Sequence, residues 1–224
     1  MNAVDSHIHW FPHSFYKFLA ARTEVPRTER EGDHWRYING LRSVRMWPEW
    51  FDLDMQFETA AKTGLDAVLV SSMGVHSDLD GLPADAAREG ARIVNEEWSA
   101  AQRRYRGKFF GIAAVPLADT GMAIDELEHA IGALDLRGVS LPGSINGEPI
   151  DAPRLEPFYA RVEELGVPIF IHPTDGAFVD AMAGEGYGNA VYKSLGRVVD
   201  SSVGVLPYAA GRLDKNARVP DLAQ

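Results

Sequence analysis

Short apolar runs alternate along the chain with longer segments in which apolar residues recur every three to four positions. The apolar runs predict five strands, and three of them carry almost no polar side chain, as strands covered on both faces do. The expected strands are residues 3–10, 66–73, 109–116, 136–142 and 168–173. This alternation of strand and helix is typical of a parallel α/β protein.

Four amphipathic helical stripes lie between the expected strands. Their apolar positions fall within residues 53–61, 87–105, 124–134 and 155–165. Gly64 and Gly166 follow the first and the last stripe, where a helix commonly ends on a glycine. We interpret all four stripes as surfaces that face the core rather than as functional motifs.

Residues 12–50 interrupt this rhythm, because they are rich in Arg, Glu, Trp and Tyr and show no clear period. A connection of about forty residues inside one domain is commonly functional or disordered. It directly follows the first expected strand, so in a barrel it would lie at the carboxyl-terminal face, where barrel enzymes carry their active sites. We therefore expect residues 12–50 to be an active-site loop or lid within a single domain, residues 1–224.

Composition and charge narrow the classes of function. The formal net charge of -10 repels nucleic-acid phosphates and anionic lipid surfaces, and no run of 18 apolar residues occurs, so neither nucleic acid nor a membrane is expected as a partner. The chain contains no cysteine, which leaves imidazole and carboxylate groups as the ligands for any metal. The N-terminal residues lack the regions of a signal peptide, so we expect a cytoplasmic protein.

Three histidines stand at or near the ends of expected strands. His7 and His9 flank Ile8, so their side chains point to the same face of the first strand. His172 lies near the end of the fifth strand, and the carboxyl ends of parallel barrel strands meet at one rim. Because neutral imidazole is a good ligand for several transition metals, we expect these three residues to bind one ion. Alternatively, each histidine is an ordinary polar residue whose ring nitrogens form hydrogen bonds with water or with neighbouring carbonyl groups.

The order of these motifs resembles the amidohydrolase superfamily. Within it, the chain is similar to the branch that contains aminocarboxymuconate-semialdehyde decarboxylase and related aromatic-acid decarboxylases. The motifs that carry the resemblance are the opening Val4-Asp5-Ser6-His7-Ile8-His9, the run Phe170-Ile171-His172-Pro173, and residues 52–66 and 204–214. The resemblance spans nearly the whole chain and implies a distorted (β/α)8 TIM barrel with a divalent metal, usually zinc and sometimes manganese.

Carried over by position, the resemblance implies roles for five residues. His7, His9 and His172 would be the metal ligands. Arg36 would hold a substrate carboxylate, and Arg212 would reach the substrate of a neighbouring subunit, so we expect a homodimer. A planar guanidinium pairs with a carboxylate in two-pronged fashion, which suits both arginines, although each alone could equally be a surface residue.

The chain departs from this family after His172. The resemblance leads us to expect a further strand ending in a catalytic histidine before residues 204–207, and an aspartate at the end of an eighth strand. No histidine follows His172, and no such aspartate follows. A chain of 224 residues with a long inserted loop also cannot comfortably close eight β/α units. We therefore expect an incomplete barrel with segments missing after Val203 and after Gln224, and the acid–base catalyst stays unassigned.

The leading expectation for function is a metal-dependent, non-oxidative decarboxylase of an aromatic or unsaturated carboxylic acid. A hydrolase or hydratase acting on a lactone, an amide or an oxo-acid could use the same metal site. If the chain is complete as given, a third alternative is a non-catalytic barrel that binds an organic acid or a partner protein.

Overall fold

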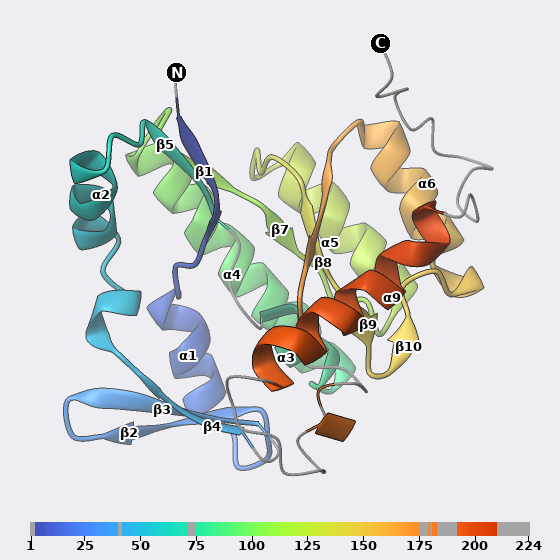
Figure 1. Ribbon diagram of the computed structural model, residues 1–224, viewed down its shortest axis with the longest axis horizontal. Helices are drawn as coiled ribbons and strands as arrows, with labels where there is room; N and C mark the ends of the chain where they lie inside the picture. The colour runs from blue at the N-terminus through green and yellow to red at the C-terminus, as the bar shows by residue number, and fades with distance from the viewer. Residues whose placement is uncertain are drawn as a thin grey trace.

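The computed structural model describes residues 3–39, 42–70, 75–174, 179, 181–182 and 192–209. Parallel strands follow one another around an arc in the order of the sequence (Figure 1). The arc consists of two three-stranded sheets that the chain itself connects. All five strands expected from the sequence are present, so the prediction of a parallel α/β architecture is confirmed.

The first sheet has the order β1-β5-β6. β1 (Val4–Ile8) pairs with β5 (Ala67–Val70), and β5 pairs with β6 (Phe109–Gly111). The register of β1 shifts between Asp5 and Ile8, which marks a bulge or irregularity just before the strand ends. β1 is the outer strand of this sheet, and its carboxyl end lies at the metal site expected from the sequence.

The second sheet has the order β11-β8-β7. β7 (Ala113–Ala114) pairs with β8 (Val139–Pro142), which pairs with β11 (Ile169–His172). Only the buried Ile112 separates β7 from β6, so one expected strand serves both sheets. Among the described residues β1 and β11 each have one strand neighbour, and barrel closure is not shown.

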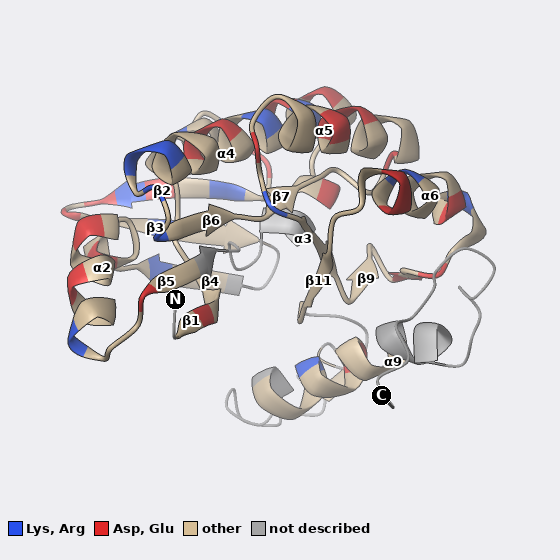
Figure 2. Ribbon diagram, turned by 90° about the horizontal axis from the view of Figure 1, so that it is seen from above, with Lys and Arg blue, Asp and Glu red and all other residues tan. Residues whose placement is uncertain are grey.

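The four expected helices are present as α2 (Leu53–Lys62), α4 (Ala84–Arg104), α5 (Thr120–Gly132) and α6 (Glu156–Leu165). α4, α5 and α6 cover the outer side of the arc (Figure 2). Gly166 ends α6 in the left-handed conformation, at φ 65°, which a residue without a Cβ adopts at no steric cost.

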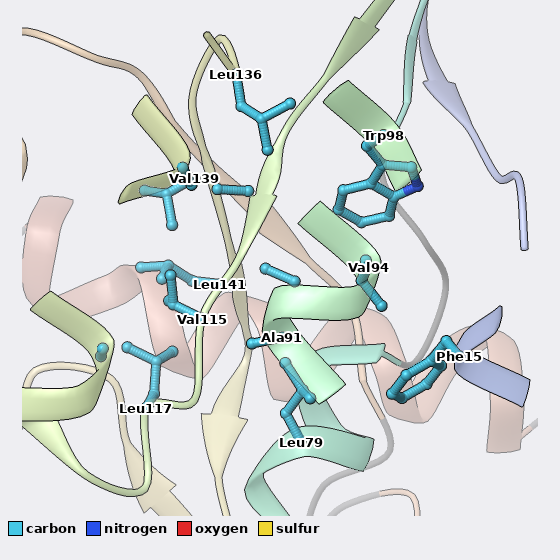
Figure 3. Packing of buried hydrophobic residues seen from close by; sticks show 14 of the residues in the cluster. Phe15, Leu79, Ala91, Val94, Trp98, Val115, Leu117, Leu136, Val139 and Leu141 are labelled. Atoms are coloured by element: carbon cyan, nitrogen blue, oxygen red, sulfur yellow. The ribbon is translucent and has the colours of Figure 1, made fainter. Parts of the chain in front are cut away.

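The hydrophobic core fills the space between these helices and the strands. Trp98 and Val94 on α4 lie opposite Leu136, Val139 and Leu141, which come from β8 and the turn before it (Figure 3). All five side chains are at most 2% exposed. Burying one such aliphatic side chain stabilises a fold by roughly 1.5–3 kcal/mol. The packing between α4 and β8 therefore holds the strand ends in place.

Residues 12–50, for which the sequence showed no period, contain regular structure. Helix α1 (His13–Ala20) precedes an antiparallel sheet of β2 (Arg27–Glu31), β3 (His34–Asn39) and β4 (Arg42–Met46), and a 3-10 turn at Pro48–Trp50 leads into α2. The sheet lies below α1 in Figure 1.

One face of this small sheet packs on the rest of the molecule. Thr28 donates to the carbonyl oxygen of Tyr16 on α1, and Tyr37 donates to the buried carboxylate of Asp78. Because strand side chains alternate, Arg36 lies on the other face. The segment expected as a loop is therefore an anchored sheet with a polar face.

Shorter elements complete the described chain. They are α3 (Val75–Asp80), β9 (Ser144–Ile145), β10 (Glu148–Pro149), a 3-10 turn (Pro153–Leu155), a π-helical turn (Tyr192–Gly196) and α9 (Arg197–Ala209). α9 lies on the side of the strands opposite to α4 and α5 (Figure 2). None of the helices in the described ranges is both long and apolar enough to traverse a bilayer.

Candidate metal centre

Three imidazole rings meet at the carboxyl ends of β1 and β11. The Nε2 atom of His7 lies 3.2 Å from that of His9 and 3.2 Å from that of His172, and the third side of this triangle is 3.4 Å. The structure thus brings together the three histidines singled out in the sequence, and within the described ranges no carboxylate joins their group.

The curvature of the arc produces this meeting. β1 and β11 are its outermost strands and are not paired with each other in either sheet, yet their ends face each other across the concave side. Near the end of β1, the backbone N–H of His7 donates to Asp5 Oδ1 at 3.0 Å, which restrains the strand where the ligands project. Two chain segments about 165 residues apart therefore supply one set of nitrogen donors.

The three rings differ in exposure. His7 is exposed, His9 is half-buried, and His172 is buried at 9% exposure. Burial, together with the neighbouring charges of His9 and His7, lowers the pKa of His172 to about 4. His172 is therefore neutral at pH 7, with a nitrogen lone pair that can bind a metal.

The spacing of the nitrogens fits a bound ion. With metal–nitrogen bonds of about 2.05 Å, as for zinc and imidazole, separations of 3.2–3.4 Å give angles of roughly 103–112° at the ion. These values surround the tetrahedral angle of a four-coordinate zinc ion, of which the three histidines would supply three ligands. Longer bonds would narrow the angles toward those of an octahedral ion, so the spacing also admits manganese.

Arg36, expected to hold a substrate carboxylate, lies on β3 and already pairs with a carboxylate. Its Nε and Nη2 atoms donate to the two carboxylate oxygens of Glu31, the second at 2.6 Å, and Nη1 donates to Ser43 Oγ at 3.1 Å. The ion pair raises the pKa of Arg36 and lowers the pKa of Glu31. Arg212, the other expected arginine, lies outside the described residues.

Glu31 is a residue that the reasoning from sequence missed. It ends β2, and Gly32 and Asp33 form the turn to β3, with Gly32 at φ 61°. A glycine-containing two-residue turn between alternating segments is a recognisable hairpin signal, and it would have placed Glu31 diagonally opposite Arg36.

A cavity of about 500 Å³ lies apart from the three imidazoles. Trp10, Phe51, Glu97, Arg104 and Tyr105 are among its lining residues. None of the three histidines lines it, although Trp10 directly follows His9.

Sequence comparisons identify decarboxylases among the relatives. The chain is 27% identical over 132 residues to 2-amino-3-carboxymuconate-6-semialdehyde decarboxylase of Dictyostelium discoideum, covering 59% of this chain and 36% of the relative. It is 35% identical over 113 residues to gamma-resorcylate decarboxylase of Rhodococcus jostii, covering 46% and 33%. The chain thus matches about a third of the length of these curated relatives.

Solved structures share the fold of this chain. An apo crystal structure of Metarhizium anisopliae IDCase matches with a TM-score of 0.81 and 26% identity, covering 96% of this chain and 62% of that one. Dihydroxybenzoic acid decarboxylase from Polaromonas sp., solved with manganese and the inhibitor 2-nitroresorcinol, matches with a TM-score of 0.68 and 20% identity, covering 96% and 63%. The family model for amidohydrolases matches residues 4–220. The chain therefore belongs to the amidohydrolase family, as the resemblance of its motifs predicted.

Proposed function

We propose that this protein is a metal-dependent, non-oxidative decarboxylase of an aromatic or unsaturated carboxylic acid. The observation that carries the proposal is the convergence of three imidazole nitrogens within 3.4 Å of one another. The names of the sequence relatives, which are decarboxylases, support the reaction type.

We assign His7, His9 and His172 as the metal ligands and zinc as the ion, with manganese as the alternative. The all-nitrogen donor set and the near-tetrahedral angles favour zinc, whereas the Polaromonas relative binds manganese. A divalent ion held there would polarise a substrate oxygen as a Lewis acid.

The chain's own residues would bind and orient the substrate. In this proposal Arg36 holds a carboxylate through the two-pronged geometry that its contact with Glu31 already displays. The burial of His172 limits the access of water to one side of the centre. In the reaction the bond between the ring or chain carbon and the carboxylate breaks, carbon dioxide leaves, and a proton is added to that carbon. The donor of this proton is not assigned among the described residues.

The direct test is carbon dioxide release. Protein loaded with zinc or manganese is incubated with 2,6-dihydroxybenzoate carrying a 13C carboxylate, and labelled bicarbonate and resorcinol are measured together. The His172→Ala variant should lose turnover, whereas His129→Ala, which removes an imidazole from α5, should retain it. Failure to release label from this and related aromatic acids, with metal bound to each chain, would refute the decarboxylase. Product formed without label release would point to a hydrolase or hydratase.

We further propose a cytoplasmic homodimer. In this dimer residues 12–50 act as the active-site lid, and Arg212 reaches the substrate bound to the neighbouring subunit. The lid proposal is supported by the position of the anchored β2–β4 sheet, which follows the His9 segment in the chain. Mixing His172→Ala with Arg212→Ala tests the dimer, because mixed dimers would restore one competent site if Arg212 acts across the interface. Activity no greater than that of the separate variants would contradict this arrangement.

A further inference from the structure

A carboxylate of the chain itself holds the guanidinium that is proposed to bind substrate. Glu31 engages Arg36 at Nε and Nη2, and Ser43 engages Nη1. Both charged side chains are about one-third exposed, at 34% for Arg36 and 36% for Glu31. The pair is thus open to solvent and to small anions.

This contact uses the edge of the guanidinium that suits a carboxylate. Arginine presents five N–H donors in a fixed plane, and a two-pronged partner takes two parallel donors from one edge. A second carboxylate beside the first would face the negative charge of Glu31 at close range, which is unfavourable. A carboxylate ligand therefore binds Arg36 best after Glu31 has withdrawn.

We propose that Glu31 is a built-in competitor for the substrate carboxylate and thereby sets the affinity of the Arg36 subsite. This inference rests on the proposed function, because it takes Arg36 as the group that receives the substrate. Glu31 occupies the guanidinium in the free protein, and the incoming carboxylate replaces it. Glu31 is thus an affinity-determining residue that acts through Arg36.

A purely structural role for the pair makes a different prediction. Glu31 and Arg36 lie diagonally across the β2–β3 hairpin, so their ion pair could simply stabilise the turn. In that case, removing the carboxylate of Glu31 would lower thermal stability and leave the affinity for an external carboxylate unchanged. Binding measurements therefore separate the two roles.

The experiment uses benzoate as the probe and zinc-loaded full-length protein. Calorimetry measures the dissociation constant of benzoate for the wild type, Glu31→Gln, Arg36→Met and the double variant. Glu29→Gln is the matched control, since Glu29 lies on the same face of the sheet, directly opposite Arg36, but forms its ion pair with Arg27. Modification of Arg36 by phenylglyoxal, located by peptide mass spectrometry, reports the accessibility of the guanidinium without any need for turnover.

We expect Glu31→Gln to bind benzoate about two- to fivefold more tightly, which corresponds to the usual worth of an exposed ion pair. It should also speed modification of Arg36, and benzoate should protect against this reagent. Glu29→Gln should have a smaller effect on both, and the effect of Glu31→Gln on benzoate binding should vanish in the Arg36→Met background.

Two failures are distinguishable. If Arg36→Met weakens benzoate binding but Glu31→Gln does not strengthen it, the competitor role is overturned while the carboxylate subsite stands. If Arg36→Met leaves benzoate binding unchanged, the subsite in the proposed function is wrong, and the inference falls with it.

Discussion

Asn95 on α4 offers a sharp test of how the two halves of the arc are held together. Its side chain is fully buried and contacts Ala114, immediately beyond the point where the chain passes from the first sheet to the second. The amide Nδ2 donates to the carbonyl oxygen of Ala114 and to Glu126 Oε1, each at 2.8 Å, and Oδ1 accepts from the N–H of Ala114 at 2.9 Å. Asn95 thus supplies the hydrogen bonds that a neighbouring strand would otherwise make.

Replacing Asn95 by alanine leaves two buried backbone groups of Ala114 without these bonds. Each unsatisfied buried group costs about 1–3 kcal/mol, so we expect a loss of about 3 kcal/mol after partial relaxation. For a chain of this size, that loss lowers Tm by roughly 6–12 °C. Because the two sheets carry different metal ligands, the affinity for zinc should fall as well.

Asn95→Asp is the more discriminating change. It replaces the donor NH2 group by an oxygen that faces both a carbonyl group and the carboxylate of Glu126. Two carboxylates in one buried site repel each other unless one is protonated, so this variant should be less stable than Asn95→Ala at pH 8 and should recover part of the difference at pH 5. Urea unfolding followed by circular dichroism measures both. A loss below about 1 kcal/mol for Asn95→Ala, or equal stability of the two variants at pH 8, would refute the reasoning.

Three further predictions follow from buried or crowded positions. Burial raises the pKa of Asp80 to about 7, so the folded state penalises its ionised form, and this penalty grows as pH rises from about 4 through about 7. Asp80→Asn should therefore flatten the dependence of Tm on pH over that range, and an unchanged slope would contradict the assignment. Tyr37→Phe removes the hydrogen bond to buried Asp78, so hydrogen exchange of the β2–β4 amides should accelerate, whereas equal protection would show that this contact does not anchor the sheet. At Gly138 a Cβ would lie 2.8 Å from a backbone carbonyl oxygen just before β11, so Gly138→Ala should cost about 1–3 kcal/mol, while Gly132→Ala, which meets nothing within 4 Å, should be neutral or stabilising in the same unfolding assay.

Much of the arc was predictable because its strands are apolar on both faces. Runs such as Ala67–Val70 fit a buried strand better than a helix, and the four amphipathic stripes lie between the expected strands. The break at Ile112 was not predictable, since residues 109–116 are almost uniformly apolar. It depends on how the strand changes partners as the arc curves.

The small sheet was missed for a different physical reason. Trp35 and Tyr37 alternate with His34 and Arg36 at the period of a strand, but the outward positions are charged and the inward ones only half-buried. The apolar signal is therefore weak, and pairing with β2 and β4 supplies most of the order. The ion pair of Arg36 with Glu31 depends on that pairing and could not be found from single residues.

The convergence of the histidines was predictable because strand alternation and the common rim of parallel strands are local rules with a shared geometric outcome. What the sequence could not provide was the triangle of 3.2–3.4 Å separations, which requires the two outermost strands to curve toward each other. The metal assignment itself rests on that triangle.

Equilibrium zinc binding, measured with a chromophoric competitor near pH 7.5, tests this assignment most directly. The wild-type protein should bind about one zinc ion per chain, and His172→Ala should lose that tight binding while keeping the circular dichroism of the folded protein. A wild-type protein that binds no zinc or manganese, or a folded His172→Ala variant that binds the ion as tightly as the wild type, would contradict the proposed centre.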